Sequence, residues 1–241
     1  MQKVKQIYEG KAKILYSTDD PGLIIQYFKD DATAFNNVKK DIIEGKGVLN
    51  NFISEFIMLE LAAEKIPTHF VKRISNREQI VKKVKIIPLE VIMRNISAGS
   101  MAKRLGMLEG IKLSGPVFEI SYKNDALQDP LINDDHAVKV LNLLSQDQLE
   151  IIRNYAFKIN EILQKIFLDI NIKLVDFKVE FGFDEAGNIV LADEISPDSC
   201  RLWDKDSNNK MDKDRFRRDL GGLTEAYAEV ANRLGIKLIS N

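Results

Sequence analysis

The stretch LVDFKVEFGFDEAGNIVLADEISPDSCRLW, residues 174–203, carries the strongest pattern in the chain. Asp176, Lys178 and Glu180 alternate strictly with apolar residues. Successive side chains of a strand point to opposite faces of a sheet, so these three charged residues share one face above a buried layer. An ordinary half-buried strand with a solvated face gives the same alternation. The pattern therefore predicts a strand and leaves open whether its charges are functional.

The second half of this stretch predicts an antiparallel hairpin. Apolar runs flank DEAGN, residues 184–188, and its Asp, Gly and Asn are turn formers. If Asp184 pairs with Ile189, Glu180 lies directly opposite Asp193, and both carboxylates come within reach of one metal ion. A register shifted by one residue would instead send Asp193 toward the apolar side, where an unpaired carboxylate is costly.

The composition is that of a folded globular chain without an overall attraction for polyanions. Its 241 residues are 45% hydrophobic and 29% charged, and the formal net charge is −1. Nothing global therefore draws the chain toward nucleic acid or an anionic membrane. No apolar run reaches the roughly 18 residues of a membrane span, and MQKVKQIYEGKAK is too polar for a signal peptide. We expect a cytoplasmic location.

Cysteine and histidine are scarce. Cys200 is the single cysteine, which permits no internal disulfide and fits a reducing compartment. His69 and His136 are the only histidines and leave little for a zinc site. We expect any metal to be a hard, oxygen-liganded ion such as magnesium.

The expected secondary structure of the chain changes near residue 85. Residues 1–84 read as short strands, YEGKAKILYS, LIIQYFKD, THFVKRIS and QIVKKVKII, interrupted by one helical pattern over residues 46–65. Residues 85–241 open with the strand PLEVIMRNI and contain most of the expected helix. The sequence therefore predicts an α+β fold, in which a small antiparallel β-rich lobe packs on a larger α+β lobe with a cleft between them.

Three helices are expected in the larger part. A short one covers residues 100–105, and a last one covers about residues 212–234. Ser145 and Gln148 give the long helix between them a capping-box start. Its apolar face consists of Leu149, Ile152, Ala156, Ile159, Leu163 and Ile166.

Two short segments carry candidate anion-binding residues. In GKAK, Lys11 and Lys13 stand two apart on an expected strand and would project to one side toward phosphates, although lysines on an exposed edge strand give the same pattern. In RNISAGS, Arg94 ends a strand and Ser100 stands where it can cap a helix. An arginine at a helix start suits a monophosphate, and plain helix capping explains the segment equally well.

Seven spaced motifs occur together in one order, which is far more specific than any one of them. The motifs are Y-x-G-K-A-K at 8–13, K-G-x-x-N-N at 46–51, V-x-x-R-N-x-x-A-G-S at 91–100, K-N-D-A-x-x-D-P at 123–130, L-V-D-F-K-x-E-F-G at 174–182, D-E-x-S-P-D-x-x-R-x-W-D at 193–204 and M-D-K-D-x-F-R at 211–217. On these motifs the chain closely resembles the SAICAR synthetase family of purine-pathway ligases over nearly its whole length.

The resemblance implies an ATP-dependent condensation of carboxyaminoimidazole ribonucleotide (CAIR) with L-aspartate that gives SAICAR, ADP and phosphate. A carboxylate is a poor electrophile, because amide formation would have to expel oxide or hydroxide. The implied route therefore phosphorylates the CAIR carboxylate and lets the aspartate amine displace phosphate from the acyl phosphate. Magnesium would offset the charge between ATP and this anionic acceptor.

The resemblance also implies roles for the charged row of the opening stretch. Glu180 and Asp193 would hold magnesium at the nucleotide phosphates, and Asp129 and Asp176 would serve a second metal cluster near the CAIR carboxylate. Lys178 would stay protonated between acids and orient the substrate rather than act as a base. With Lys123, the residues Lys178, Asp176 and Asp129 form the implied catalytic group.

The remaining implied contacts divide between the two substrates. Apolar walls with main-chain polar groups are a common solution for binding adenine. A guanidinium fork suits a phosphate dianion. For ATP, Lys11 and Lys13 with Ala12 would meet the phosphates, and Ile14, Leu15 and Val81 would pack against the adenine beside the backbone of Lys82. For CAIR, Arg94, Ser100 and Arg201 would bind the 5′-phosphate. Lys123 and Asp125 would also lie at the CAIR end.

Two other classes of function compete with this one. A kinase-like phosphotransferase would also use a strand lysine and metal-binding acids, yet the chain has no H-R-D, D-F-G or G-x-G-x-x-G segment. A silent nucleotide-binding module could have lost acids of the metal row, and this chain keeps all of them.

Relatives suggest a homodimer. The one departure from the family pattern is Cys200, where a small residue such as serine is expected.

Overall fold

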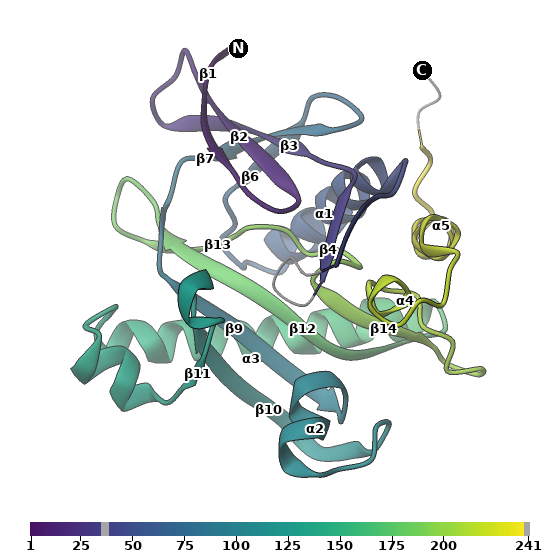
Figure 1. The fold of residues 1–241 in the computed structure, drawn as a ribbon. Helices are drawn as coiled ribbons and strands as arrows, with labels where there is room; N and C mark the ends of the chain where they lie inside the picture. Colours follow the sequence, from purple (N-terminus) through teal and green to yellow (C-terminus); the bar gives the residue numbers. More distant parts are fainter. Residues whose placement is uncertain (35–38, 239–241) are drawn as a thin grey trace.

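Two antiparallel sheets lie one above the other in the computed structural model, which describes residues 1–34 and 39–238 (Figure 1). The smaller sheet is built from the first part of the chain and has the strand order β1-β2-β3-β7-β6. Its strands are β1 (Lys3–Glu9), β2 (Lys13–Thr18), β3 (Leu23–Phe28), β6 (Phe70–Arg73) and β7 (Glu78–Lys82).

The first predicted strand is in fact the end of one strand, a turn and a second strand. Gly10 donates its N–H to the carbonyl of Lys13 at 2.8 Å, which closes the turn between β1 and β2. Lys11 therefore lies in the turn, and only Lys13 lies on β2. The expectation that both lysines project from one strand was wrong, because the chain reverses inside the motif.

The larger sheet is organised around the long strand β12, which pairs with β9, β13, β14 and β8 (Figure 1). The strand predicted from the alternation around Asp176, Lys178 and Glu180 and the hairpin predicted after it, β12 with β13, are confirmed. A separate two-stranded ribbon, β4 (Asp31–Ala34) with β5 (Lys39–Ile42), stands beside both sheets. The strands of the larger sheet are β8 (Lys85–Ile86), β9 (Leu89–Ile96), β10 (Lys112–Tyr122), β11 (Leu131–Ile132), β12 (Ile172–Phe183), β13 (Ile189–Ala192) and β14 (Cys200–Asp204).

The register of the β12–β13 hairpin differs by one residue from the prediction. Glu180 pairs with Ala192, and Asp184 donates its N–H to the carbonyl of Asn188 at 2.9 Å. The loop is thus one residue shorter, because Gly187 adopts a φ of 82° and closes a three-residue turn. In this register Asp193 is not directly opposite Glu180.

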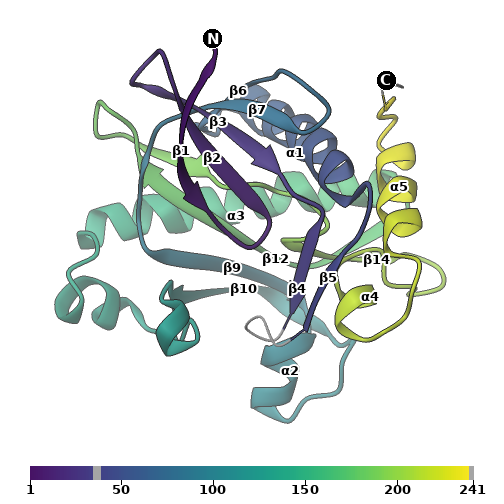
Figure 2. The ribbon, with the colours of Figure 1, turned by 45° about the horizontal axis from the view of Figure 1, so that its top comes forward.

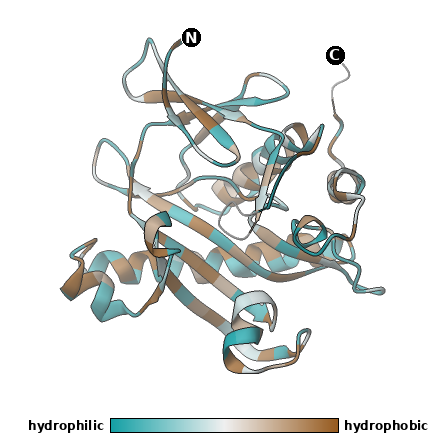
Figure 3. Cartoon of the chain, in the orientation of Figure 1, coloured by the Kyte–Doolittle hydropathy of each residue, from teal (hydrophilic) through white to brown (hydrophobic). Residues whose placement is uncertain are grey.

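Five α-helices, a 3-10 helix (Asp125–Leu127) and a π-helix (His136–Val140) complete the described fold. The long helix α3 lies against β12, β9 and β10, and its capping box between Ser145 and Gln148 is confirmed. Figure 3 shows hydrophobic and hydrophilic residues alternating along it, as one face packs on the sheet. The helices are α1 (Lys46–Ala63), α2 (Gly99–Leu105), α3 (Gln146–Asp169), α4 (Asp214–Arg217) and α5 (Leu223–Arg233).

The expected last helix is two helices. Gly221 and Gly222 have φ values of 67° and 60°, so the backbone leaves the right-handed region between α4 and α5. The segment before α5 can then turn, and α5 packs on α1 (Figure 2). Helix α4 lies beside β14 of the larger sheet (Figure 1).

One hydrophobic cluster runs through most of the molecule. It joins residues of α1, such as Ile53 and Ile57, to Phe177 and Phe181 of β12 and to Tyr227 of α5. The α+β class is confirmed, and the division of the chain at residue 85 stays a prediction. No helix in residues 1–34 and 39–238 is both long and apolar enough to cross a membrane.

Candidate active site

A cavity of about 690 Å³ opens between the two sheets. We call it the cleft pocket. Strand β2 and the turn before it line one side, β12 lines the other, and the loop after β13 closes the end. Eight lysine or arginine residues and nine acidic residues line it, so its charge is nearly balanced.

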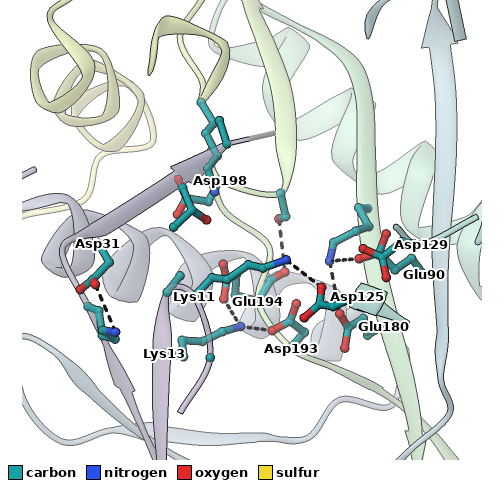
Figure 4. Close-up of a pocket in the computed structure, with 18 of the residues that line it drawn as sticks. Lys11, Lys13, Asp31, Glu90, Asp125, Asp129, Glu180, Asp193, Glu194 and Asp198 are labelled. Atoms are coloured by element: carbon teal, nitrogen blue, oxygen red, sulfur yellow. Dashed lines mark hydrogen bonds and ion pairs between the residues drawn. The ribbon is translucent and has the colours of Figure 1, made fainter. Parts of the chain in front are cut away.

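Lysines of the small sheet reach across the cleft pocket to acids of the larger sheet (Figure 4). Lys13 forms ion pairs with Asp193 and Glu194. Lys11 donates to Asp125 at 2.8 Å. The structure thus brings both lysines of the GKAK motif to the cleft, although they come from different local structures.

Glu180 lies at the centre of the opposite wall. It is 3% exposed and accepts hydrogen bonds from Lys123 at 2.5 Å and from Lys178 at 3.2 Å. Burial opposes its charge, but the field of Lys178 and Lys123 prevails and lowers the pKa of Glu180 to about 2. The carboxylate is therefore ionised across the physiological range.

Lys178 has two acidic neighbours, as predicted, but only Glu180 is one of the two expected from the alternation. Its ammonium donates to Glu90 of β9 at 2.8 Å and to Glu180. Burial disfavours the charged form, yet these carboxylates more than compensate and raise the pKa of Lys178. Its partner is Glu90 rather than Asp176, because β9 runs beside β12.

Asp193 reaches the cleft pocket in spite of the shifted register. It follows the last residue of β13 and has a φ of 63°, so the alternation of faces ends there. Its carbonyl accepts a hydrogen bond from Nε2 of His69 at 2.9 Å. Burial, followed by the charge of Lys13, lowers the pKa of His69 to about 3, so the ring is neutral. A left-handed residue and a buried histidine thus place the carboxylate of Asp193 on the same pocket as Glu180.

A second cavity, of about 160 Å³, lies further along β12, and we call it the arginine pocket. Three adjacent strands place Arg94, Asp176 and Arg201 side by side, since Asp176 pairs in register with both arginines. Oδ2 of Asp176 accepts from Arg94 at 2.9 Å and from Arg201 at 2.8 Å. Four cationic and two acidic residues line this pocket, so it carries a cationic surplus.

Ser100 lines the arginine pocket, but it does not cap the helix. Ala98 is the N-cap residue of α2 and Ser100 is inside the helix, so the capping prediction was wrong. Nη2 of Arg94 lies 3.4 Å from the Ser100 hydroxyl. Gly99 has a φ of 55°, and a Cβ there would collide with the Arg201 guanidinium. Glycine thus permits the helix start to approach the arginine closely.

A second layer of carboxylates holds the arginines. Glu119 accepts from Nε of Arg94 at 2.6 Å, and Asp214 accepts from Nε of Arg201 at 3.0 Å. Burial opposes the charge of Asp214, but its arginine partners lower its pKa to about 2. Burial and the field of Asp214 raise the pKa of its neighbour Asp212 to about 7. These acids offset part of the arginine charge from behind the pocket.

The residues expected around adenine are not part of the cleft pocket. Ile14, Leu15, Val81 and Lys82 do not line it. Val81 is fully buried in the small sheet. The backbone N–H of Lys82 already donates to the carbonyl of His69 at 2.7 Å. The assignment of an adenine wall to these residues stays a prediction.

The acids of the cleft pocket suit magnesium in chemistry. Within the described residues, no group of three or more His, Cys, Asp or Glu side chains is preassembled around one point. Magnesium is commonly held by one or two carboxylates together with substrate phosphates, so a preassembled cage is not required. Glu180 and Asp193 are two such carboxylates on one pocket. Lysines pair with both of them in the structure.

Asp129 and Asp125 also line the cleft pocket, as the loop motif predicted. Oδ1 of Asp129 accepts the N–H of Asn124 at 2.8 Å, which ties the loop to itself. Asp176, by contrast, lines the arginine pocket and is neutralised there. The two acids assigned to one second metal cluster thus line different pockets.

Several residues of the cleft pocket were not predicted from the sequence. Glu90, Glu194 and Asp198 line the cleft pocket, and only their occurrence in or near the motifs could have indicated them. Lys213 and Arg217 line it as well. Both belong to the motif at residues 211–217, which carried no local sign of the direction of its side chains.

Comparison with known proteins decides which family has this arrangement. The family model described as SAICAR synthetase matches residues 6–234. The chain belongs to the SAICAR synthetase family. The phosphoribosylaminoimidazole-succinocarboxamide synthase of Rhizobium meliloti (strain 1021) is 56% identical over 239 residues, which cover 98% of this chain and 94% of that relative.

Solved structures of SAICAR synthetases agree with the fold. The crystal structure of the synthase from Ehrlichia chaffeensis has a TM-score of 0.95 and 48% identity, covering 98% of this chain and 100% of that one. A SAICAR synthetase (Type-2) in complex with ADP has a TM-score of 0.93 and 47% identity, covering 97% and 99%. Family membership confirms the expected activity, that of a SAICAR synthetase in purine biosynthesis, and leaves the kinase-like alternative without support.

Proposed function

We propose that ATP binds in the cleft pocket and CAIR binds along β12, with its 5′-phosphate in the arginine pocket. The observation that carries this proposal is the meeting of the two pockets at Lys178, which lines both. A nucleotide and a ribonucleotide bound in this way would bring the γ-phosphate and the imidazole carboxylate together. ADP in the complex of the 47% identical SAICAR synthetase supports ATP as the nucleotide.

The triphosphate would be met by Lys11 and Lys13 with the backbone of Ala12. Magnesium would be held by Glu180 and Asp193, where it would supply charge compensation between the triphosphate and the anionic acceptor. Lys13 would then exchange its carboxylate partners for phosphate oxygens. The adenine would lie against Leu15 and Val81 near the backbone of Lys82.

The 5′-phosphate of CAIR would be bound by Arg94, Ser100 and Arg201. Their guanidinium forks suit a phosphate dianion, and Asp176 holds both arginines with one oxygen. We expect Asp176 to act mainly by orienting these arginines. Its assignment with Asp129 to a second metal cluster stays a prediction that the arginine pairing makes less favourable.

The reaction would proceed in two balanced steps. A CAIR carboxylate oxygen attacks the γ-phosphorus, the bond to the β–γ bridging oxygen breaks, and ADP leaves. The aspartate amine then attacks the acyl carbon, phosphate leaves with the C–O electron pair, and the nitrogen releases a proton. Lys178 is held protonated, so it would orient the carboxylate rather than remove the proton, while Lys123 and Asp125 would lie near the CAIR end.

ADP release tests this function directly. We expect release with ATP, CAIR and L-aspartate together with magnesium, and none when either CAIR or aspartate is omitted in the steady state. ADP release without aspartate would indicate a different phosphotransferase. Light scattering would test the expected homodimer, and fractionation of cells would test the expected cytoplasmic location.

A further inference from the structure

Tyr8 opens the Y-x-G-K-A-K motif, and the proposed function gives it no role. It is the penultimate residue of β1 and pairs in register with Leu15 of β2. Residues directly opposite one another in a sheet project to the same face, and so do residues two apart on a strand. Tyr8 therefore shares a face with Leu15 and Lys13, and it lines the cleft pocket together with Lys13.

The ring of Tyr8 lies against the turn that joins β1 to β2. A Cβ on Gly10 would stand 3.0 Å from Cε1 and 3.3 Å from the hydroxyl oxygen of Tyr8. Gly10 does not have a positive φ, so its backbone conformation alone would accept another residue. The small size of Gly10, rather than its conformational freedom, lets the ring and its hydroxyl come close to the turn.

The turn itself offers donors to an anion. The N–H groups of Lys11 and Ala12 make no hydrogen bond within the part of the chain that the structure describes. Successive free N–H groups in a turn form a concavity that suits an anion. The carbonyl of Ala12 accepts the N–H of Lys29 at 2.8 Å, and the Lys29 ammonium donates to Glu9 at 2.8 Å. The turn is thus tied down on the side away from these donors.

The hydroxyl of Tyr8 is free to serve the same anion. Tyr8 is 57% exposed, and its hydroxyl has no hydrogen-bond partner among the described residues. A tyrosine hydroxyl can donate to a phosphate oxygen. Lys11 and Lys13, by contrast, are paired with Asp125 and Asp193 and have to exchange these partners before they can bind a phosphate. Tyr8 can bind without giving up a contact.

We propose that the Tyr8 hydroxyl binds the phosphate chain of the nucleotide, together with the free N–H groups of the turn. The inference rests on the proposed binding of ATP in the cleft pocket. A hydrogen bond to a charged acceptor is stronger than one between neutral groups, so an uncharged hydroxyl can add affinity for a phosphate. It does so without adding a charge that the acids of the pocket would neutralise.

The test compares Y8F with the wild-type enzyme, because phenylalanine keeps the ring and removes only the hydroxyl. We expect the inhibition constant of a non-hydrolysable ATP analogue to rise about tenfold, the lower end of the effect of losing a hydrogen bond to a charged group. The inhibition constant of adenosine, which has no phosphate, should change by less than about twofold. The KM for ATP should rise as for the analogue, with kcat and the KM for CAIR within about twofold of wild type.

Two further variants separate the hydroxyl from the ring and from the sheet. Y8L removes the ring together with the hydroxyl and should weaken the ATP analogue at least as much as Y8F. Tyr16 is the matched control, because it lies on β2 and lines neither pocket. The ammonium of Lys3 lies 4.4 Å from the centre of its ring. Y16F should leave both inhibition constants unchanged.

Three outcomes would overturn the proposal. One is an unchanged inhibition constant of the ATP analogue in Y8F, even with Y8L impaired, since the ring alone would then matter. Another is an equal weakening of the analogue and of adenosine, which would place the hydroxyl at the ribose or the base. The third is a raised KM for CAIR with ATP binding unchanged. Wild-type enzyme that releases no ADP with all three substrates would instead refute the proposed function itself.

Discussion

The cleft pocket and the arginine pocket lie on one strand and differ in how they manage charge. Acids and cations are nearly equal in number in the cleft pocket, whereas cations exceed acids by two to one in the arginine pocket. A polyphosphate entering the first must displace carboxylates from lysines or arrive with a metal ion. A phosphate entering the second meets arginines that are already held in place. We infer that only the cleft pocket depends on magnesium.

The largest expected effect is at Glu180 in the cleft pocket. Glu180→Gln keeps the shape and removes the negative charge, so we expect kcat to fall about a thousandfold at saturating substrates, as loss of a group that holds a catalytic metal would cause. Thermal unfolding should show that the variant folds. Glu185→Gln, in the exposed hairpin turn, is the control. Near-normal turnover of Glu180→Gln at limiting magnesium would break the comparison.

The next effect belongs to the arginine pocket. Arg94→Lys keeps the charge and loses the planar fork, so the KM for CAIR should rise about 10- to 100-fold with little change in the KM for ATP. Arg104 bonds the same Glu119 but lies outside both pockets, and Arg104→Lys should change neither constant. Calorimetry that showed ATP as the weakened ligand would reverse the placement of the two substrates.

A smaller effect follows from the neutral His69 behind the cleft pocket. Its pKa is about 3 in the folded chain against 6.5 for the free side chain, so the unfolded chain binds more protons between these values. Its contribution to stability is therefore complete above pH 6.5 and is lost as pH falls. Urea unfolding should show His69→Gln losing less stability than wild type below pH 6.5, by up to about 1.4 kcal/mol per pH unit.

The control for this comparison is the exposed His136. His136→Gln should run parallel to wild type over the same pH range. If His69→Gln also ran parallel, the ring would not be held neutral. The turn at Asp193 would then need a different explanation.

The smallest effect concerns Cys200, which lines the arginine pocket and is 2% exposed. Burial raises the pKa of its thiol, so the reactive thiolate is scarce. A thiol reagent should modify the chain only on unfolding. Cys200→Ser should leave the KM for CAIR and the KM for ATP within about twofold of wild type, since the side chains are similar in size. Rapid modification of the folded enzyme with loss of CAIR binding would contradict this.

The sequence could predict the faces of β12 but not the register of its hairpin. Alternation over Asp176, Lys178 and Glu180 depends only on the period of a strand, so it holds whatever the partner. The register depends on a loop that closed one residue earlier at Gly187. Asp193 kept its expected pocket only through a left-handed φ and the distant His69, and neither has a local signal.

The acidic partners of Arg94 and Arg201 also could not be predicted from the sequence. Arg94 and Arg201 were expected at a phosphate, but their shared contact with Asp176 requires β9, β12 and β14 to align across long stretches of chain. Lys213 and Arg217 belong to the motif at residues 211–217, but the sequence does not indicate toward which pocket their side chains point. The break at Gly221 and Gly222, which divides the expected last helix into α4 and α5, was not revealed by the helical pattern.

The inference that the two pockets differ in their need for metal is tested most directly by calorimetry with and without magnesium. The ligands are a non-hydrolysable ATP analogue and the ribonucleotide that carries an amide in place of the CAIR carboxylate. We predict that chelating magnesium weakens binding of the ATP analogue about tenfold or more and changes ribonucleotide binding by less than about twofold. Equal loss for both ligands, or a loss confined to the ribonucleotide, would contradict the assignment of magnesium to Glu180 and Asp193.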